Sequence, residues 1–146
     1  MLQLKELYQD TILEHGQNPR NFGEMKKADF STELFNPLCG DRYQVYLKVN
    51  KGKIKGSSFE GEGCLISKAS ASMMTEILRD KKIREAVETF QCFKGLVTGE
   101  KIECKTNLEK LVSFSGISKF PVRIKCALLP WYALQYIYVK KMHSMS

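Results

Sequence analysis

The chain has 146 residues, 43% of them hydrophobic, and a formal net charge of +7. This length and apolar content are enough for one domain with its own core, and no apolar run reaches the ~18 residues of a membrane span. Charged residues are mixed into the start of the chain, which does not resemble a signal peptide. We therefore expect a cytoplasmic protein whose thiols stay reduced.

The first predicted element is an amphipathic helix over 4–15, because its apolar residues recur at helical spacing and Gly16 ends the pattern. His15 would then cap this helix or lie on the surface. A turn at 18–23 follows, punctuated by proline and glycine.

Three strands are predicted next, over 28–35, 41–49 and 53–60. In the second strand, apolar residues alternate with polar ones, which is typical of a half-buried strand. A tight turn at 50–52 joins the second and third strands into a hairpin. With the first strand, expected at the edge, the hairpin forms an antiparallel meander.

The rest of the chain is mainly helical. We expect a helix rich in small residues over 65–78, a second over 83–93, and a less regular stretch over 95–118 with a short helix near 108–112. A long amphipathic helix should begin near 122, with Pro130 either kinking it or marking its first turn, and 142–146 should be a polar tail in which His143 is disordered. Strands followed by helices predict an α+β fold, a small three-stranded antiparallel sheet with helices packed on it.

Three of the five cysteines lie close to glycine or proline, at predicted turns or helix starts. Cys39 precedes Gly40-Asp41 on a turn, Cys64 follows a glycine just before a helix, and Cys126 follows Pro121 and is expected to open a helix. The positive end of a helix dipole favours thiolate, the form of cysteine that binds metals and attacks sulfur.

These cysteines are expected to meet in one pocket. In a meander, the start of the second strand and the end of the third lie at the same end of the sheet, which brings Cys39 near Cys64. Three thiolates with the Asp41 carboxylate suit zinc or iron in a cluster. The odd number of cysteines favours metal or thiol chemistry over a disulfide framework, and we interpret Cys92 and Cys104 as small buried hydrophobic residues.

The same motifs resemble those of the iron–sulfur scaffold family that includes SufU, IscU and the N-terminal part of NifU. The resemblance covers nearly the whole chain, and its motifs are Asn18-Pro19-Arg20-Asn21, Cys39-Gly40-Asp41, Gly61-Glu62-Gly63-Cys64 and Lys125-Cys126. It implies a single domain over 1–146 with the SufE/NifU-like fold. Lys125, the stretch at 119–122 and a SufU-type insertion over 99–118 make the chain more similar to SufU than to IscU.

The resemblance further implies iron–sulfur cluster assembly at a metal site of Cys39, Asp41, Cys64 and Cys126. Zn²⁺ would occupy the site at rest, and a transient [2Fe–2S] cluster would be the alternative occupant. Cys39 is the favoured acceptor of persulfide sulfur and Cys126 the alternative, with Lys125 in an auxiliary role. The implied partners are a SufS-like cysteine desulfurase and recipient apoproteins or other Suf components.

Two questions stay open at this point. The protein is either a zinc-dependent sulfurtransferase or a non-enzymatic scaffold. A different class, a structural zinc module that binds nucleic acid through its basic surface, would explain the net charge. The scattered basic residues and the absence of paired Cys-x-x-Cys motifs argue against that class and against a nucleic-acid partner.

Overall fold

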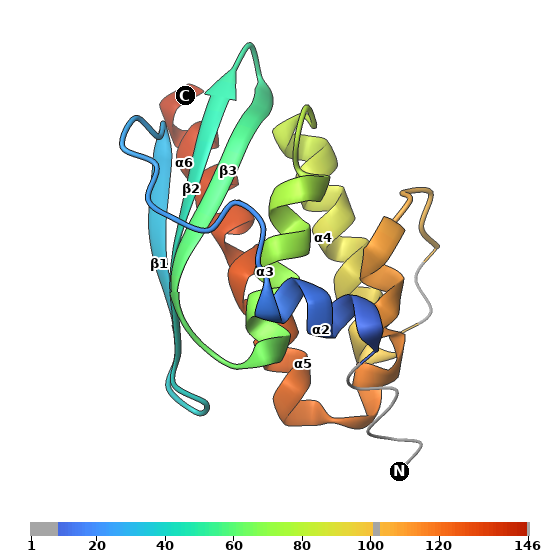
Figure 1. Ribbon diagram of the computed structural model, residues 1–146. Coiled ribbons are helices and arrows are strands. Elements are labelled where there is room, and N and C mark those ends of the chain that lie inside the picture. The colour runs from blue at the N-terminus through green and yellow to red at the C-terminus, as the bar shows by residue number, and fades with distance from the viewer. Residues whose placement is uncertain (1–8, 101–102, 146) are drawn as a thin grey trace.

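The computed structural model describes residues 9–100 and 103–145, with side chains as far as residue 140. The predicted α+β architecture is confirmed (Figure 1). In chain order, the elements are α2 (Asp10–Gln17), β1 (Phe30–Asn36), β2 (Asp41–Asn50), β3 (Lys53–Glu62), α3 (Leu65–Ile77), α4 (Ile83–Thr98), the 3-10 helix η1 (Glu109–Lys119), α5 (Pro121–Leu128), the 3-10 turn η2 (Leu129–Trp131) and α6 (Tyr132–Met145). The part of the predicted first helix that precedes residue 9 lies outside the described residues.

The sheet is an antiparallel meander in the order β1-β2-β3, as predicted. Burial alternates along β2, so that Tyr43, Val45 and Leu47 face the core. Asp41 opens β2 on the same buried face, while Arg42 pairs with Glu62 at the end of β3. The start of β2 and the end of β3 therefore lie side by side at one end of the sheet.

The helices lie together on one side of the sheet (Figure 1). α3 packs against β3, and α6 packs against β1. α2 lies across α3, and α4 packs against both α6 and η1. Small side chains along α3, among them Ser70 and Ser72, are fully buried and allow this close packing.

The helical half of the chain is more regular than predicted. α4 continues to Thr98, where Gly99 ends it with a left-handed backbone (φ 77°). η1 is longer than the short helix predicted near 108–112, and 103–108 is irregular, as predicted. The predicted long helix is divided into α5 and α6. Pro130 lies between them in the 3-10 turn η2, so it neither kinks a continuous helix nor lies in the first turn of one. The backbone of the predicted polar tail, including His143, is helical as far as Met145.

His15 is buried rather than a surface or capping group, and this prediction was wrong. Only 1% of the residue is exposed, and its Nδ1 lies 2.7 Å from the hydroxyl of Ser72 on α3. α2 packs along α3, so the last turn of α2 faces a neighbouring helix instead of solvent.

Cys92 and Cys104 are joined by a disulfide, which corrects the expectation that both are reduced, buried hydrophobic residues. Cys92 is buried on α4, but Cys104 is exposed in the segment that follows. The bond ties this irregular segment to α4. Among the described residues, no helix is long and apolar enough to cross a membrane.

Substitution of Ser70 would test how α3 packs in the core. The Ser70 hydroxyl accepts a hydrogen bond from Nε1 of buried Trp131 (3.0 Å) and donates one to the carbonyl of Ala127. We expect Ser70→Ala to lower the free energy of unfolding by about 1–3 kcal/mol, because the indole N–H loses its partner in the core. Urea denaturation measures this, with exposed Ser115→Ala as a matched control. Equal stability of the two variants would contradict the assignment.

Buried His15 predicts a pH-dependent stability. Burial lowers its pKa from 6.5, and the charges of Arg20 and Lys110 add to this effect, while Glu76 and Glu14 oppose it. The folded state therefore binds fewer protons than the unfolded state just below pH 6.5. The contribution is fully present above that pH and is lost as the pH falls.

We expect the free energy of unfolding of the wild type to fall more steeply than that of His15→Gln between about pH 7 and pH 5. Urea denaturation at several pH values gives both profiles. Parallel profiles would show that His15 does not titrate differently in the two states.

Candidate metal centre

Cys39 lies on the tight turn between β1 and β2. The N–H of Gly40 donates to the carbonyl of Asn36 (2.8 Å), and Gly40 has a left-handed backbone (φ 74°), which glycine adopts without steric cost. The turn leads directly into Asp41, the first residue of β2. The Cys39 thiol donates to the Asp41 carboxylate, with Sγ 2.9 Å from Oδ2.

Cys64 caps the N-terminus of α3, as predicted. Its backbone is extended, and its sulfur accepts the N–H of Ser67 at 3.4 Å. Its own N–H donates to Oδ1 of Asp41 at 2.8 Å, and its sulfur lies 3.9 Å from Oδ2 of the same carboxylate. Asp41 therefore links the start of β2 to the start of α3.

Cys126 does not open its helix, so that part of the prediction was wrong. α5 begins at Pro121, the favoured residue at the first helical position, and Cys126 lies in its second turn. Its side chain is fully buried, and its sulfur lies 3.4 Å from that of Cys39. The helix N-terminus therefore does not act on this thiol.

The structure brings three of the four predicted ligands together. Ligand atoms of Cys39, Asp41 and Cys126 all lie within 4.8 Å of one another. Cys64 is not part of that compact trio, although its sulfur lies 3.9 Å from Oδ2 of Asp41. Lys125, the predicted auxiliary residue, is exposed on α5 next to Cys126 in the chain.

The thiols differ in their ionisation. The hydrogen bond with Cys126 lowers the pKa of Cys64, and the N–H of Ser67 acts in the same direction against the effect of burial. The hydrogen bond to Cys64, followed by burial, raises the pKa of Cys126. Burial and the hydrogen bond to Asp41 raise the pKa of Cys39. Within this pair, the shared hydrogen bond therefore favours ionisation of Cys64 over ionisation of Cys126.

This cluster fits a metal cation. Asp41 is fully buried, and its carboxylate forms no ion pair with any basic side chain in the described part of the chain. A buried carboxylate among thiols without a cation is costly. Three sulfurs and one carboxylate oxygen match the donors and the coordination number of tetrahedral Zn²⁺.

Sequence reasoning missed the polar side chains that support this cluster. The hydroxyl of Ser67 lies 2.7 Å from that of buried Tyr43 and donates to the carbonyl of Cys64 at 3.1 Å. Ser67 is three residues after the helix cap, the position whose N–H a capping side chain accepts, so the spacing from Cys64 held this signal. Tyr43 belongs to the alternating pattern of the second strand, which predicts a buried face but no hydrogen-bond partner.

A family model described as the NifU-like N terminal domain matches residues 7–127. The zinc-dependent sulfurtransferase SufU of Bacillus subtilis (strain 168) is 39% identical over 132 residues, which span 90% of this chain and 89% of that protein. The iron–sulfur cluster assembly scaffold protein IscU of Thermotoga maritima is 33% identical over 131 residues, which span 90% and 92%.

A solved structure is similar over the same extent. The SufU protein of Fervidobacterium islandicum AW-1 superimposes with a TM-score of 0.83 at 30% identity, over 90% of this chain and 96% of that one. This similarity confirms the predicted NifU-like fold.

Substitution of Gly63 would test the close packing around Asp41. A Cβ at this position would lie 2.7 Å from Oδ1 of Asp41 and 2.2 Å from the hydroxyl of Tyr43. We expect Gly63→Ala to displace the carboxylate and to weaken Zn²⁺ binding roughly tenfold or more, measured by competition with a chelating dye. Gly56→Ala is the matched control, because its Cβ would make only ordinary contacts. Equal affinity of the two variants would contradict the close approach at Gly63.

Proposed function

Because the chain belongs to the family of NifU-like N-terminal domains, we propose that it works in iron–sulfur cluster assembly as a zinc-bound acceptor of persulfide sulfur. The donor would be a SufS-like cysteine desulfurase in the cytoplasm. Similarity to the B. subtilis protein named as a zinc-dependent sulfurtransferase supports this proposal. We further propose that residues 1–146 form one domain, in which 99–118 is a SufU-type insertion.

The proposed zinc ligands are Cys39, Asp41, Cys64 and Cys126. When bound, Zn²⁺ would keep the thiols ionised and protected from oxidation. Asp41 is the hardest donor of the set and the natural one to yield its position. Its hydrogen bond from the N–H of Cys64 holds the carboxylate in place by a contact that does not depend on the metal.

The exposure of Cys39 is the observation that carries the choice of acceptor. Cys39 is partly exposed on its turn, whereas Cys126 is fully buried. A persulfide on another protein reaches an exposed sulfur more easily. The Cys39 thiolate would attack the outer sulfur of the donor persulfide and form a new S–S bond. The S–S bond in the donor breaks, and its cysteine leaves as the thiolate.

An apolar surface next to Cys39 offers a docking site for the desulfurase. Leu38 is 72% exposed and Phe35 is 48% exposed, and together with Tyr132 they line a hollow of about 330 Å³. Lys125 lies on the same rim and forms no ion pair with the described residues, so it is available to an acidic side chain of the partner. Exposed apolar residues with a charged rim are typical of a protein interface.

A scaffold role uses the same ligands. A [2Fe–2S] cluster would then be the cargo, built on Cys39, Cys64 and Cys126 and passed to recipient apoproteins or other Suf components. Similarity to the T. maritima IscU supports this variant. The nucleic-acid-binding zinc module is not favoured, because the family match extends over most of the chain.

Persulfide mapping tests the acceptor. We expect anaerobic incubation with a cysteine desulfurase and cysteine to place a persulfide on Cys39, detected by alkylation and peptide mass spectrometry. Cys39→Ser should lose this label and the stimulation of desulfurase turnover. The double variant Cys92→Ser/Cys104→Ser is the matched control and should keep both. A persulfide on Cys126 with Cys39 unmodified would contradict the assignment.

The same preparation separates sulfur transfer from scaffolding. Stimulated desulfurase turnover without iron supports transfer. A visible-absorbing cluster that forms with iron and sulfide and passes to an apoprotein supports scaffolding. If all three single alanine variants of Cys39, Cys64 and Cys126 retained metal and accepted sulfur, both forms of the proposal would fail.

A further inference from the structure

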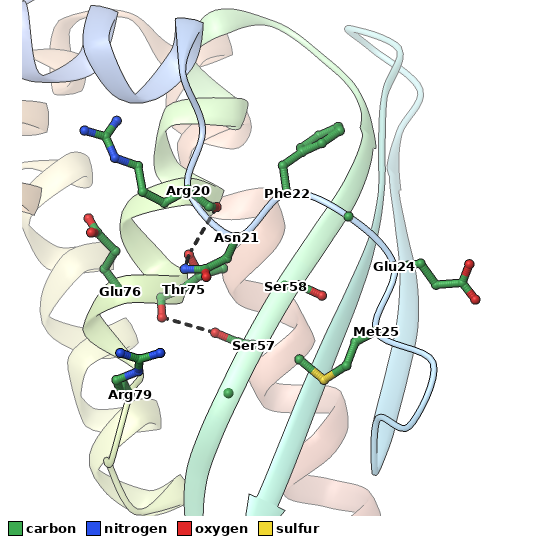
Figure 2. Close-up of a pocket in the computed structure, with 12 residues that line it drawn as sticks. Arg20, Asn21, Phe22, Glu24, Met25, Ser57, Ser58, Thr75, Glu76 and Arg79 are labelled. Atoms are coloured by element: carbon green, nitrogen blue, oxygen red, sulfur yellow. Dashed lines mark hydrogen bonds between the residues drawn. The ribbon is translucent and has the colours of Figure 1, made fainter.

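A second hollow lies at the outer edge of β3, and none of its lining residues belongs to the metal centre. Its volume is about 640 Å³, and it runs between β3, the end of α3 and the segment at 20–25 (Figure 2). Cys64 and Arg79 mark the two ends of the helical stretch between the sites, which puts them roughly 20 Å apart at 1.5 Å per residue. The hollow is therefore distinct from the metal centre.

β3 is an edge strand, and other segments pair with its outer edge before and after the part that lines this hollow. Ile54 exchanges backbone hydrogen bonds with residues 80–81, and Phe59 exchanges them with residues 21–23. Ser57 lies two residues before Phe59, so its N–H and C=O point to the same outer edge. No backbone hydrogen bond from the described residues reaches Ser57 on that side.

The hollow has one unpaired cation. Arg20 is already bound to Glu14 at 3.2 Å, whereas Arg79 is exposed and has no ion-pair partner among the described residues. Glu76 is directed towards His15, at 3.6 Å. Glu24 lies across β3 from Arg79 (Figure 2). One end of the hollow therefore attracts a carboxylate, and the other end repels one.

The remaining walls suit a peptide. Phe22 is 50% exposed and lines the hollow together with Met25. The hydroxyl oxygen of Ser58 is buried there and has no hydrogen-bond partner in the part of the chain that the structure describes. Ser57 as a whole is 7% exposed, but its outer N–H and C=O have no backbone partner among the described residues. Together with the apolar wall and the Arg79 guanidinium, such a strand position is what recognises an added strand.

We propose that this hollow binds an extended segment of a partner protein that carries a single acidic residue, adds to the edge of β3 at Ser57 and places its one carboxylate on Arg79. The net charge of +7 attracts an acidic partner. A nucleic acid is not favoured, because Glu24 and Glu76 line the same hollow and would repel successive phosphates. The proposal goes beyond sulfur transfer and does not depend on it.

The test uses the zinc-loaded, ¹⁵N-labelled full chain. The probe is a pool of acetylated, amidated pentapeptides with glutamate at the centre and valine, isoleucine or threonine elsewhere. We expect saturable shifts of the amides of Gly56, Ser57 and Ser58 with a Kd of about 1 mM or lower. Arg79→Gln should weaken binding roughly tenfold, because a charge-assisted hydrogen bond is lost. A matched pool with glutamine at the centre should bind the wild type about as weakly as the glutamate pool binds Arg79→Gln.

Arg84→Gln is the control variant. Arg84 is also exposed, but it lies on α4, where its side chain pairs with Glu88 one turn later. Arg84→Gln should leave the Kd unchanged, and Arg79→Gln should still accept persulfide sulfur, so this test and that of the proposed function fail independently. Three results would overturn the proposal: no saturable shift at these amides, equal affinity for the two pools, or the same shifts with glutarate alone at equal concentration. The last result would indicate a site for small carboxylates.

Discussion

The carboxylate of Asp41 holds the sulfur-rich end of the molecule together. One oxygen accepts the N–H of Cys64 at 2.8 Å, and the other accepts the thiol of Cys39 at 2.9 Å. These two bonds join the β1–β2 turn to the start of α3. Because the carboxylate is fully buried, both bonds act in a medium where an unpaired charge would be costly. The positions of Cys39 and Cys64 therefore depend on this one side chain.

The position of Asp41 follows from a pattern that the sequence contains. Alternation of Tyr43, Val45 and Leu47 predicts which face of the second strand is buried, and the same period extends back to Asp41. The meander likewise predicts that Cys64 approaches the start of that strand. Cys126 is different, because Pro121 starts α5 more than one turn earlier and leaves this thiol in the helix interior. Its ionisation would then require a bound cation, since no helix end supplies the charge.

The sequence patterns did not predict the contacts between segments that are far apart in the chain. His15 meets Ser72 because α2 packs along α3, and neither local pattern contains information about the other helix. Cys104 lies in a stretch without helical or strand period, so nothing in its neighbourhood indicates that it reaches Cys92 on α4. Periodicity predicts which face of an element is buried, but it does not identify the partner that covers that face.

The buried serine on α3 also explains why β3 keeps an open edge. The hydroxyl of Ser72 is 2.7 Å from the ring of His15 and 2.8 Å from the N–H of Arg20. These bonds fix the chain where it leaves α2, so that it reaches β3 at Phe59 and no further along the strand. The loop after α3 covers the strand only near its other end. The unpaired position at Ser57 therefore lies between two segments that are each held by their own hydrogen bonds, the chain after α2 at Phe59 and the loop after α3 at Ile54.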